Sequence, residues 1–229
     1  MAMTATLPSW LTPLAWFALA LALASAAAIS YDIYRRGHRQ HSTAAELVWV
    51  GSGLYLGPFA VLLYRRHFAS TRSPQNSTAG AAPTLTSTPA GSGAVLGLPG
   101  GTASAIAHLI GVPLVIASGL TIAGIDLWVM ILVIAALAIV LLASFERLSG
   151  RSSPPSLISA VVAAVITVLA FDVGMGGWML LLHFNEFMPP ATDAAFWFLM
   201  QIGVVLGLLT GFPAVAWLAR RSTSVTSPA

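Results

Sequence analysis

The chain alternates between long apolar runs and short polar stretches. Several runs are close to the roughly 20 residues that a helix needs to cross the hydrocarbon of a bilayer. They span residues 10–30, 46–64, 103–122, 127–145, 157–182 and 195–218. Within a run the apolar residues are continuous rather than alternating, which excludes a transmembrane β-barrel, and backbone groups in lipid must bond inside their own segment. The pattern predicts an all-α fold, a polytopic transmembrane helical bundle of about six spans.

Polar composition divides the chain into four parts. Residues 1–67 hold the first two predicted transmembrane helices, and residues 68–93 are rich in Ser, Thr, Pro, Gly and Ala. Such a segment has too few apolar side chains to form a core, so we predict a disordered linker. Residues 94–221 are predicted to form a four-helix transmembrane bundle, and residues 222–229 a disordered tail.

The arginines leave the topology open. With six spans and both termini inside, seven arginines face the cytoplasm and three face the opposite side. An alternative has five spans, an outside N-terminus and residues 94–122 as a re-entrant segment, and it also divides the arginines seven to three. Residues 103–122 are long and apolar enough to cross the membrane, which favours six spans.

Composition excludes several classes of protein. Hydrophobic residues make up 57% of the chain and charged residues 7%, against roughly 25% charged in a soluble domain. The chain cannot cover a water-facing surface of ordinary polarity, which excludes a soluble enzyme. The absence of cysteine and lysine excludes thiolate metal sites, cysteine nucleophiles and Schiff-base chemistry. The net charge of +3 lies at membrane boundaries, so no nucleic-acid partner is expected.

The fifth run carries the candidate functional residues. Asp172 lies near its middle, where a carboxylate costs about 2.5–3.5 kcal/mol to insert. No arginine lies within a run to pair with it, so its neutral form is favoured. On a helix, Met175, Met179 and His183 share a face with Asp172. This stripe of carboxylate, thioethers and imidazole predicts a site for a proton or for a soft cation such as Cu(I).

The sixth run predicts a close helix contact. It carries Gly203, Gly207 and Gly211, and glycines four residues apart let transmembrane helices approach closely. Gln201 and Thr210 on the same run offer hydrogen-bond acceptors to a protonated Asp172. In that alternative Asp172 is a packing residue, and the methionines of the fifth run fill the core.

The second run resembles the sixth. Each has two glycines four apart, then a proline, then an arginine pair, in residues 53–66 and 207–221. The similarity arises either from duplication or from convergence on the same signal for the end of a helix.

No catalytic arrangement is predicted. Ser104, His108 and Asp172 are the residue types of a nucleophilic triad, but no nucleophile-elbow motif surrounds Ser104. We therefore expect a protein that is not an enzyme and that binds no cofactor.

Several segments resemble an uncharacterised family of bacterial inner-membrane proteins, domain of unknown function 4396. They are YDIYRRGHRQ at 31–40, LYLGPFAVLLYRR at 54–66, residues 119–124, FDVGMGGWMLLLHF at 171–184 and residues 196–221. The resemblance implies a compact helical bundle in the bacterial inner membrane, with an acidic residue at the position of Asp172.

One departure from this family bears on chemistry. Its members typically carry a His-Cys-Gly-Ala-Gly-Cys run followed by Asp, a pattern suited to metal or redox chemistry. The aligned stretch, Pro99 to Ser104, reads PGGTAS, and His108 stands at the Asp position. The chain is therefore expected to be a divergent member in which the thiol site is missing.

These features support two functions of different classes. The first is a small cation- or proton-coupled transport protein, or a metal-handling protein, with Asp172 as its protonatable centre and a metal ion or proton as ligand. The second is a non-catalytic membrane scaffold or accessory subunit, which would bind a second copy or a membrane partner. Both place a multi-pass protein in the lipid bilayer; the substrate and the oligomeric state do not follow from the sequence.

Overall fold

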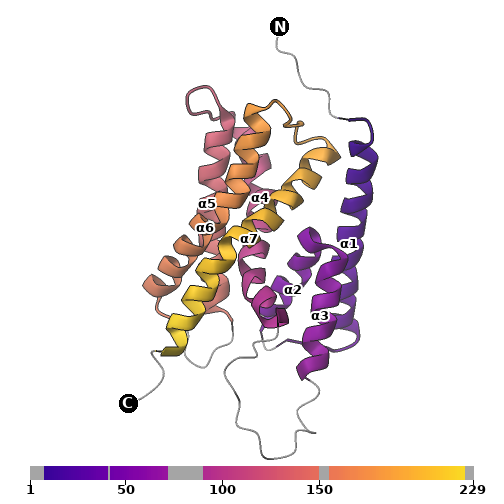
Figure 1. The fold of residues 1–229 in the computed structure, drawn as a ribbon, viewed down its shortest axis with the longest axis vertical. Coiled ribbons are helices and arrows are strands. Elements are labelled where there is room, and N and C mark those ends of the chain that lie inside the picture. Colours follow the sequence, from indigo (N-terminus) through magenta and orange to yellow (C-terminus); the bar gives the residue numbers. More distant parts are fainter. Residues whose placement is uncertain (1–7, 41, 72–89, 150–154, 225–229) are drawn as a thin grey trace, which may run out of the picture.

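The computed structural model describes residues 8–40, 42–71, 90–149 and 155–224. In these ranges the chain forms seven α-helices and no β-strand, so the all-α expectation is confirmed (Figure 1). The helices are α1 (Leu11–Arg35), α2 (Thr43–Leu56), α3 (Pro58–Thr71), α4 (Ala90–Ser118), α5 (Asp126–Arg147), α6 (Leu157–Phe184) and α7 (Ala194–Ser224). Five of them, α1 and α4 to α7, are long and apolar enough to cross a membrane.

The predicted span at 46–64 is wrong, because the chain reverses direction within it. Helices α2 and α3 have 14 residues each, and a helix of that length is about 21 Å long, too short for a hydrocarbon layer of about 30 Å. The Trp49 ring of α2 lies 5.4 Å from the Tyr64 ring and 5.4 Å from the His67 ring of α3, between centroids. In one straight helix Trp49 and Tyr64 would be about 22 Å apart. Helices α2 and α3 therefore form a re-entrant hairpin, residues 43–71 (Figure 1).

The reversal occurs at Gly57. Its backbone has φ 54° and ψ −131°, a conformation that side chains disfavour, and Pro58 then starts α3 at the position where a missing N–H is harmless. The hairpin tip bonds to the rest of the bundle. Gln201 Nε2 of α7 donates to the Leu54 carbonyl at 2.6 Å, and the Tyr55 hydroxyl donates to the Leu98 carbonyl of α4 at 3.2 Å.

A polar cluster joins the base of the hairpin to the end of α1. Arg39 Nε donates to Glu46 Oε1 at 2.6 Å, and the Glu46 side chain is only 1% exposed. The Tyr64 hydroxyl donates to Asp32 Oδ2 at 2.9 Å, and His38 Nδ1 lies 2.8 Å from the same oxygen. We call these five side chains the clasp.

Because both ends of the hairpin lie on one side, the arginines segregate. All arginines of the described residues lie at the end of the bundle that carries the clasp, which we call the arginine end: Arg35, Arg36, Arg39, Arg65, Arg66, Arg147, Arg220 and Arg221. The opposite, acidic end carries Asp126, Glu186 and Asp193 (Figure 1). From this asymmetry the positive-inside rule predicts that the arginine end faces the cytoplasm, with the start of α1 outside and the end of α7 inside.

Three predicted boundaries also change. Residues 68–71 belong to α3 and residues 90–93 to α4, so the predicted linker 68–93 is narrower, and 72–89 lie outside the described residues. Helix α7 continues to Ser224, which shortens the predicted tail at 222–229. Residues 1–67 hold one spanning helix and most of the hairpin rather than two spanning helices.

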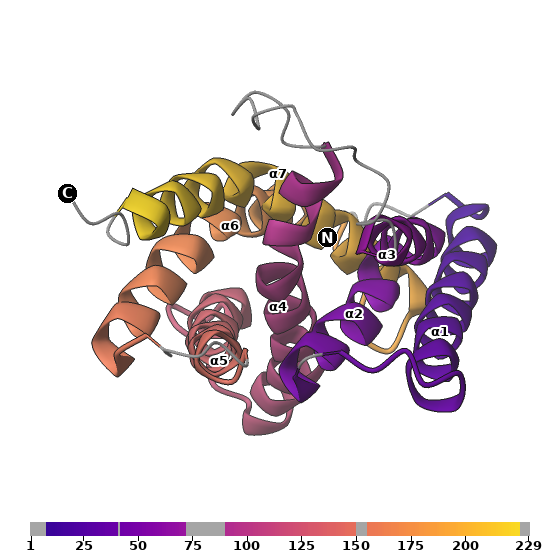
Figure 2. The same ribbon diagram turned by 90° about the horizontal axis from the view of Figure 1, so that it is seen from below.

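Helices α4 to α7 pack around the main hydrophobic core, and α1 to α3 lie beside them, where α1 and α2 contact α7 and α2 and α3 contact α4 (Figure 2). The glycines of α7 lie against α6. A Cβ added at Gly203 would lie 2.7 Å from Met175 Sδ, and one at Gly207 would lie 2.6 Å from the Phe171 ring. At Gly211 the distance to Phe171 is 3.6 Å, an ordinary contact. The close approach therefore requires glycine at the first two positions only.

Candidate functional site

The predicted stripe on α6 faces the interior of the bundle. Met175 and Met179 are buried, and Asp172 and His183 are half-buried. Asp172, Met175 and Met179 line a narrow interior pocket of about 20 Å³, while Met179 and His183 line a wider cavity at the acidic end. The four residues thus follow one another along a route from the acidic end to the centre of the bundle.

The interior pocket is bounded by α4, α5 and α6. Its lining residues are His108, Val112, Leu127, Met130, Ile131, Ile134, Asp172, Met175, Gly176 and Met179. A volume of about 20 Å³ exceeds the roughly 10–15 Å³ needed for one water molecule. The pocket therefore has room for a single water molecule or a bare ion, and a larger solute does not fit.

Two lining residues with side chains that can bind a cation were not part of the predicted stripe. His108 of α4 contributes an imidazole, and Met130 of α5 contributes a third thioether. An imidazole within a predicted span was a visible signal for His108. Nothing in the sequence distinguished Met130 from a methionine that fills the core.

His108 has a defined tautomer. Its Nδ1 lies 2.8 Å from the Ser104 carbonyl oxygen, and because a carbonyl only accepts hydrogen bonds, Nδ1 carries the proton. Nε2 is then the ring's unprotonated nitrogen, with a lone pair for a proton, a hydroxyl group or a metal ion.

The same bond is unlike that of a catalytic triad. Ser104 Oγ lies 3.4 Å from His108 Nδ1, and this nitrogen is also bonded to the Ser104 backbone. In a triad the nucleophile faces one ring nitrogen and the carboxylate the other. Here the serine occupies the nitrogen that an orienting Asp172 would need.

Asp172 makes no hydrogen bond to any residue of the described ranges, although it is half-buried. The predicted acceptors bond elsewhere. Gln201 donates to Leu54, and the Thr210 hydroxyl oxygen accepts from the Gly174 N–H at 3.1 Å. The expectation that either residue holds Asp172 in place is therefore wrong, and its carboxyl group faces the interior pocket instead.

Larger cavities lie on both sides of the interior pocket. The acidic-end cavity, about 340 Å³, contains Asp126, Met179 and His183. An arginine-end cavity of about 420 Å³ is lined by residues of α4 to α7, including Glu146 and Thr167. No residue of the described ranges lines both this cavity and the interior pocket, and Val168 and Phe171, which lie between Thr167 and Asp172 along α6, are buried.

The donors near Asp172 belong mainly to methionine. No group of three or more His, Cys, Asp or Glu side chains that could hold a metal ion occurs in the described part of the chain. The interior pocket combines one carboxyl, one imidazole and three thioethers. Such a set suits a soft monovalent cation and not a hard divalent one, which prefers several oxygen ligands.

Comparison with known proteins places this site within a family. A model of the family described as domain of unknown function (DUF4396) matches residues 92–223, which include nearly all of α4 to α7 and every residue of the interior pocket. No curated protein and no solved structure matches the chain. The match covers more than half of the chain, and with its five long apolar helices the protein is a multi-pass integral membrane protein that belongs to the DUF4396 family.

Proposed function

We propose that the protein transports a small soft cation, with Asp172 as the group that carries the compensating negative charge. The observation that supports this most is the shared position of Asp172 and His108. They come from different helices and line one pocket of single-ion size together with Met130, Met175 and Met179. In this proposal the bacterial inner membrane is the site of action.

The size and charge of the interior pocket restrict the substrate. About 20 Å³ admits a proton, a water molecule or a monatomic ion. The lining has one ionisable acid and no arginine, because the described arginines lie at the arginine end. An anion would meet a carboxyl group and no positive partner, so the lining favours a cation.

The donor atoms favour a particular class of cation. Thioether sulfur and neutral imidazole bind Cu(I) and chemically similar monovalent ions, whereas Na⁺ and Mg²⁺ prefer oxygen. A transported monovalent ion would be neutralised by one ionised Asp172, so Asp172 holds either the ion or a proton, and loading the ion releases the proton. Exchange of a cation for a proton follows from this competition.

The cavities on either side suggest how an ion would reach the interior pocket. Met179 lines both the acidic-end cavity and the interior pocket, so its thioether can pass an ion between them. Toward the arginine end, no residue of the described ranges lines both the interior pocket and the arginine-end cavity. Release on that side therefore requires side chains between them to move, as expected for alternating access.

The test is uptake of Ag⁺, a soft monovalent probe, by proteoliposomes in chloride-free buffer, with internal pH followed by a dye. We expect Ag⁺ uptake by the native protein, loss of uptake in Asp172→Asn, and at least a tenfold reduction in Met175→Leu. Met200→Leu, a buried methionine of α7 outside the interior pocket, is the matched control and should retain uptake.

Three results would contradict the proposal. Equal Ag⁺ uptake by native protein and Asp172→Asn would remove Asp172 from the route. No flux of Ag⁺ or protons through the folded native protein would favour the scaffold alternative. Proton flux that depends on Asp172 but not on Met175 would replace the metal ion with a proton as the substrate.

A further inference from the structure

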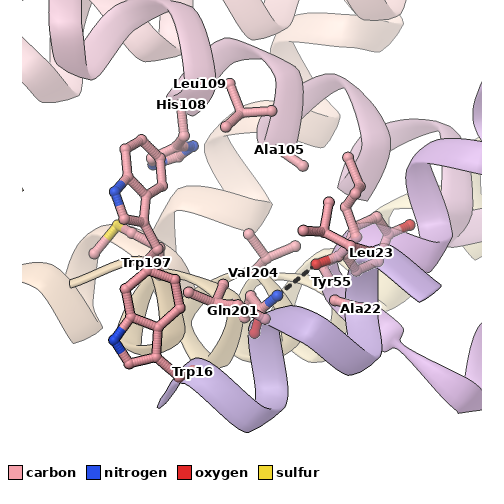
Figure 3. A pocket seen from close by; sticks show the side chains of 13 residues that line it. Trp16, Ala22, Leu23, Tyr55, Ala105, His108, Leu109, Trp197, Gln201 and Val204 are labelled. Atoms are coloured by element: carbon pink, nitrogen blue, oxygen red, sulfur yellow. Dashed lines mark hydrogen bonds between the residues drawn. The ribbon is translucent and has the colours of Figure 1, made fainter. Parts of the chain in front are cut away.

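Another cavity, which we call the lateral cavity, lies between α1, the hairpin tip, α4 and α7 (Figure 3). Its volume is about 340 Å³. His108 is the one residue that lines both this cavity and the interior pocket. The lateral cavity has no part in the proposed cation route.

The lateral cavity opens toward the bilayer. Among its lining residues, Trp16 is 64% exposed, Leu23 63% and Leu109 50%. All three lie on membrane-spanning helices, and Leu23 is at the middle of α1. Exposed apolar side chains at that depth face lipid, so a ligand would enter from the hydrocarbon layer with an apolar body.

The polar groups of the cavity describe the head of that ligand. His108 Nε2 is a hydrogen-bond acceptor because Nδ1 carries the proton. Gln201 uses one N–H on the Leu54 carbonyl, which leaves its amide oxygen and second N–H for a ligand (Figure 3). No lining residue is an arginine, lysine or carboxylic acid, so charged fatty-acid and phosphate heads are disfavoured. A neutral head that both donates and accepts hydrogen bonds is favoured.

The aromatic residues of the lateral cavity favour a ligand with a flat ring. Two indole side chains, those of Trp16 and Trp197, line the cavity (Figure 3). Trp197 Nε1 donates to the Ala191 carbonyl at 2.9 Å, which fixes that indole. Indole faces stack favourably on flat rings. The volume is more than twice that of a cavity of about 150 Å³ known to admit benzene.

We propose that the lateral cavity binds the ring of a membrane quinol, with a ring hydroxyl bonded to His108 Nε2 and a ring oxygen to the Gln201 amide. The apolar tail of the quinol extends into the bilayer past Leu23 and Leu109. The reduced ring binds more tightly than the quinone, because only the reduced ring has an O–H to donate to Nε2. Binding alone is proposed; no electron transfer is involved.

Photolabelling of the full chain in lipid nanodiscs tests this site. The probe is an azido-benzoquinone reduced to its quinol, and decyl-ubiquinol is the unlabelled competitor. We expect label in peptides of α1 and α7, suppression by decyl-ubiquinol, and weaker suppression by the oxidised competitor. Ala105→Phe, which fills the cavity, should reduce labelling at least tenfold, and Gln201→Leu should reduce it several-fold.

Leu209→Phe, on the lipid-facing side of α7, is the matched control and should label like the native protein. Helical circular dichroism and a single size-exclusion peak verify that each variant folds. Labelling that persists in folded Ala105→Phe, or that decyl-ubiquinol does not displace, would overturn the proposal. Equal labelling of the same peptides by an azido-acyl phospholipid that decyl-ubiquinol does not displace would instead show that an ordinary lipid tail fills the cavity. None of these results depends on cation transport.

Discussion

His108 of α4 and Asp172 of α6 line the same interior pocket from different helices, and His108 also lines the lateral cavity. The imidazole is thus the boundary between a pocket of single-ion size and a cavity that opens to lipid. Its Nδ1 is held by the Ser104 carbonyl, so the ring has a single lone pair, on Nε2, for a ligand. A ligand bonded there from the lateral cavity would compete with a cation in the interior pocket.

The re-entrant hairpin predicts where introduced cysteines can be labelled. The native chain has no cysteine, so single substitutions give a clean background. Thr43→Cys and Thr71→Cys mark the two ends of the hairpin, and both should react with an impermeant maleimide from the cytoplasmic side only. Ser118→Cys, at the acidic end of α4, should react from the opposite side. Reaction of Thr43→Cys and Thr71→Cys from different sides would restore a spanning helix at 46–64.

The contact between α6 and α7 predicts opposite effects for two glycines on one helix. A Cβ at Gly174 would lie 2.5 Å from the Leu206 carbonyl oxygen, so backbone must shift, whereas a Cβ at Gly177 meets nothing within 4 Å. Gly174→Ala should lower the free energy of unfolding by about 1–3 kcal/mol, as overpacking does. Gly177→Ala should raise it by up to about 1 kcal/mol, because alanine favours helix. Thermal unfolding in detergent measures both, and equal effects would contradict the contact.

The clasp predicts that the stability of the protein depends on the Arg39 side chain. Removing its side chain leaves the buried Glu46 carboxylate without its cation, at a cost of about 1–3 kcal/mol; the exposed position of Arg39 keeps the effect below that of a fully buried pair. Arg39→Ala should therefore lower the melting temperature, and adding Glu46→Gln should restore part of it. A double variant that is less stable than Arg39→Ala alone would show that the charge of Glu46 is not the cause.

The clasp should also respond to acid. Burial by itself raises the pKa of Glu46, but hydrogen bonds from Arg39 and from the Gln40 N–H outweigh it and hold the pKa below 4.5. A lowered pKa stabilises the folded state above the unfolded value and loses that contribution as pH falls. The stability difference between native protein and Glu46→Gln should therefore shrink below about pH 4.5. A difference that grows in acid would contradict this sign.

His183 predicts a kinetic effect at the acidic end. It lines the cavity there and not the interior pocket, so His183→Ala should raise the Ag⁺ concentration for half-maximal uptake several-fold and leave the maximal rate nearly unchanged. Glu186→Gln removes a negative charge from the same end without altering a cavity-lining residue, and it should leave uptake unchanged. Loss of maximal rate in His183→Ala would place His183 in the rate-limiting step instead.

The α6 stripe followed from sequence because helical spacing alone determines which residues share a face. His108 and Met130 did not, since the relative depth of three helices depends on packing between distant segments. The hairpin shows the same limit. Gly57-Pro58 ends a helix, yet α7 continues through Pro213 after a similar glycine pattern.

The reversal at the hairpin is accompanied by bonds at its tip and at its base. The hairpin tip is held by Gln201, which lies far along the chain from Leu54, and its base by the ion pair between Arg39 and Glu46. Similar local signals therefore give a reversal in one place and a bend or no break in the other. The arginines alone did not predict the orientation of the protein in the membrane. They do so only when both ends of the hairpin lie on one side of the bundle.

The most direct test of the central claim is the metal content of the interior pocket. Purified protein in detergent is loaded with Ag⁺, passed over a desalting column and analysed by mass spectrometry, beside Asp172→Asn and the double variant Met130→Leu/Met175→Leu. We predict close to one bound Ag⁺ per native chain and the loss of most of this Ag⁺ in both variants. Met200→Leu should bind as much Ag⁺ as the native protein. No bound Ag⁺ in the folded native protein, or the same amount in the double variant, would contradict a soft-cation site at Asp172.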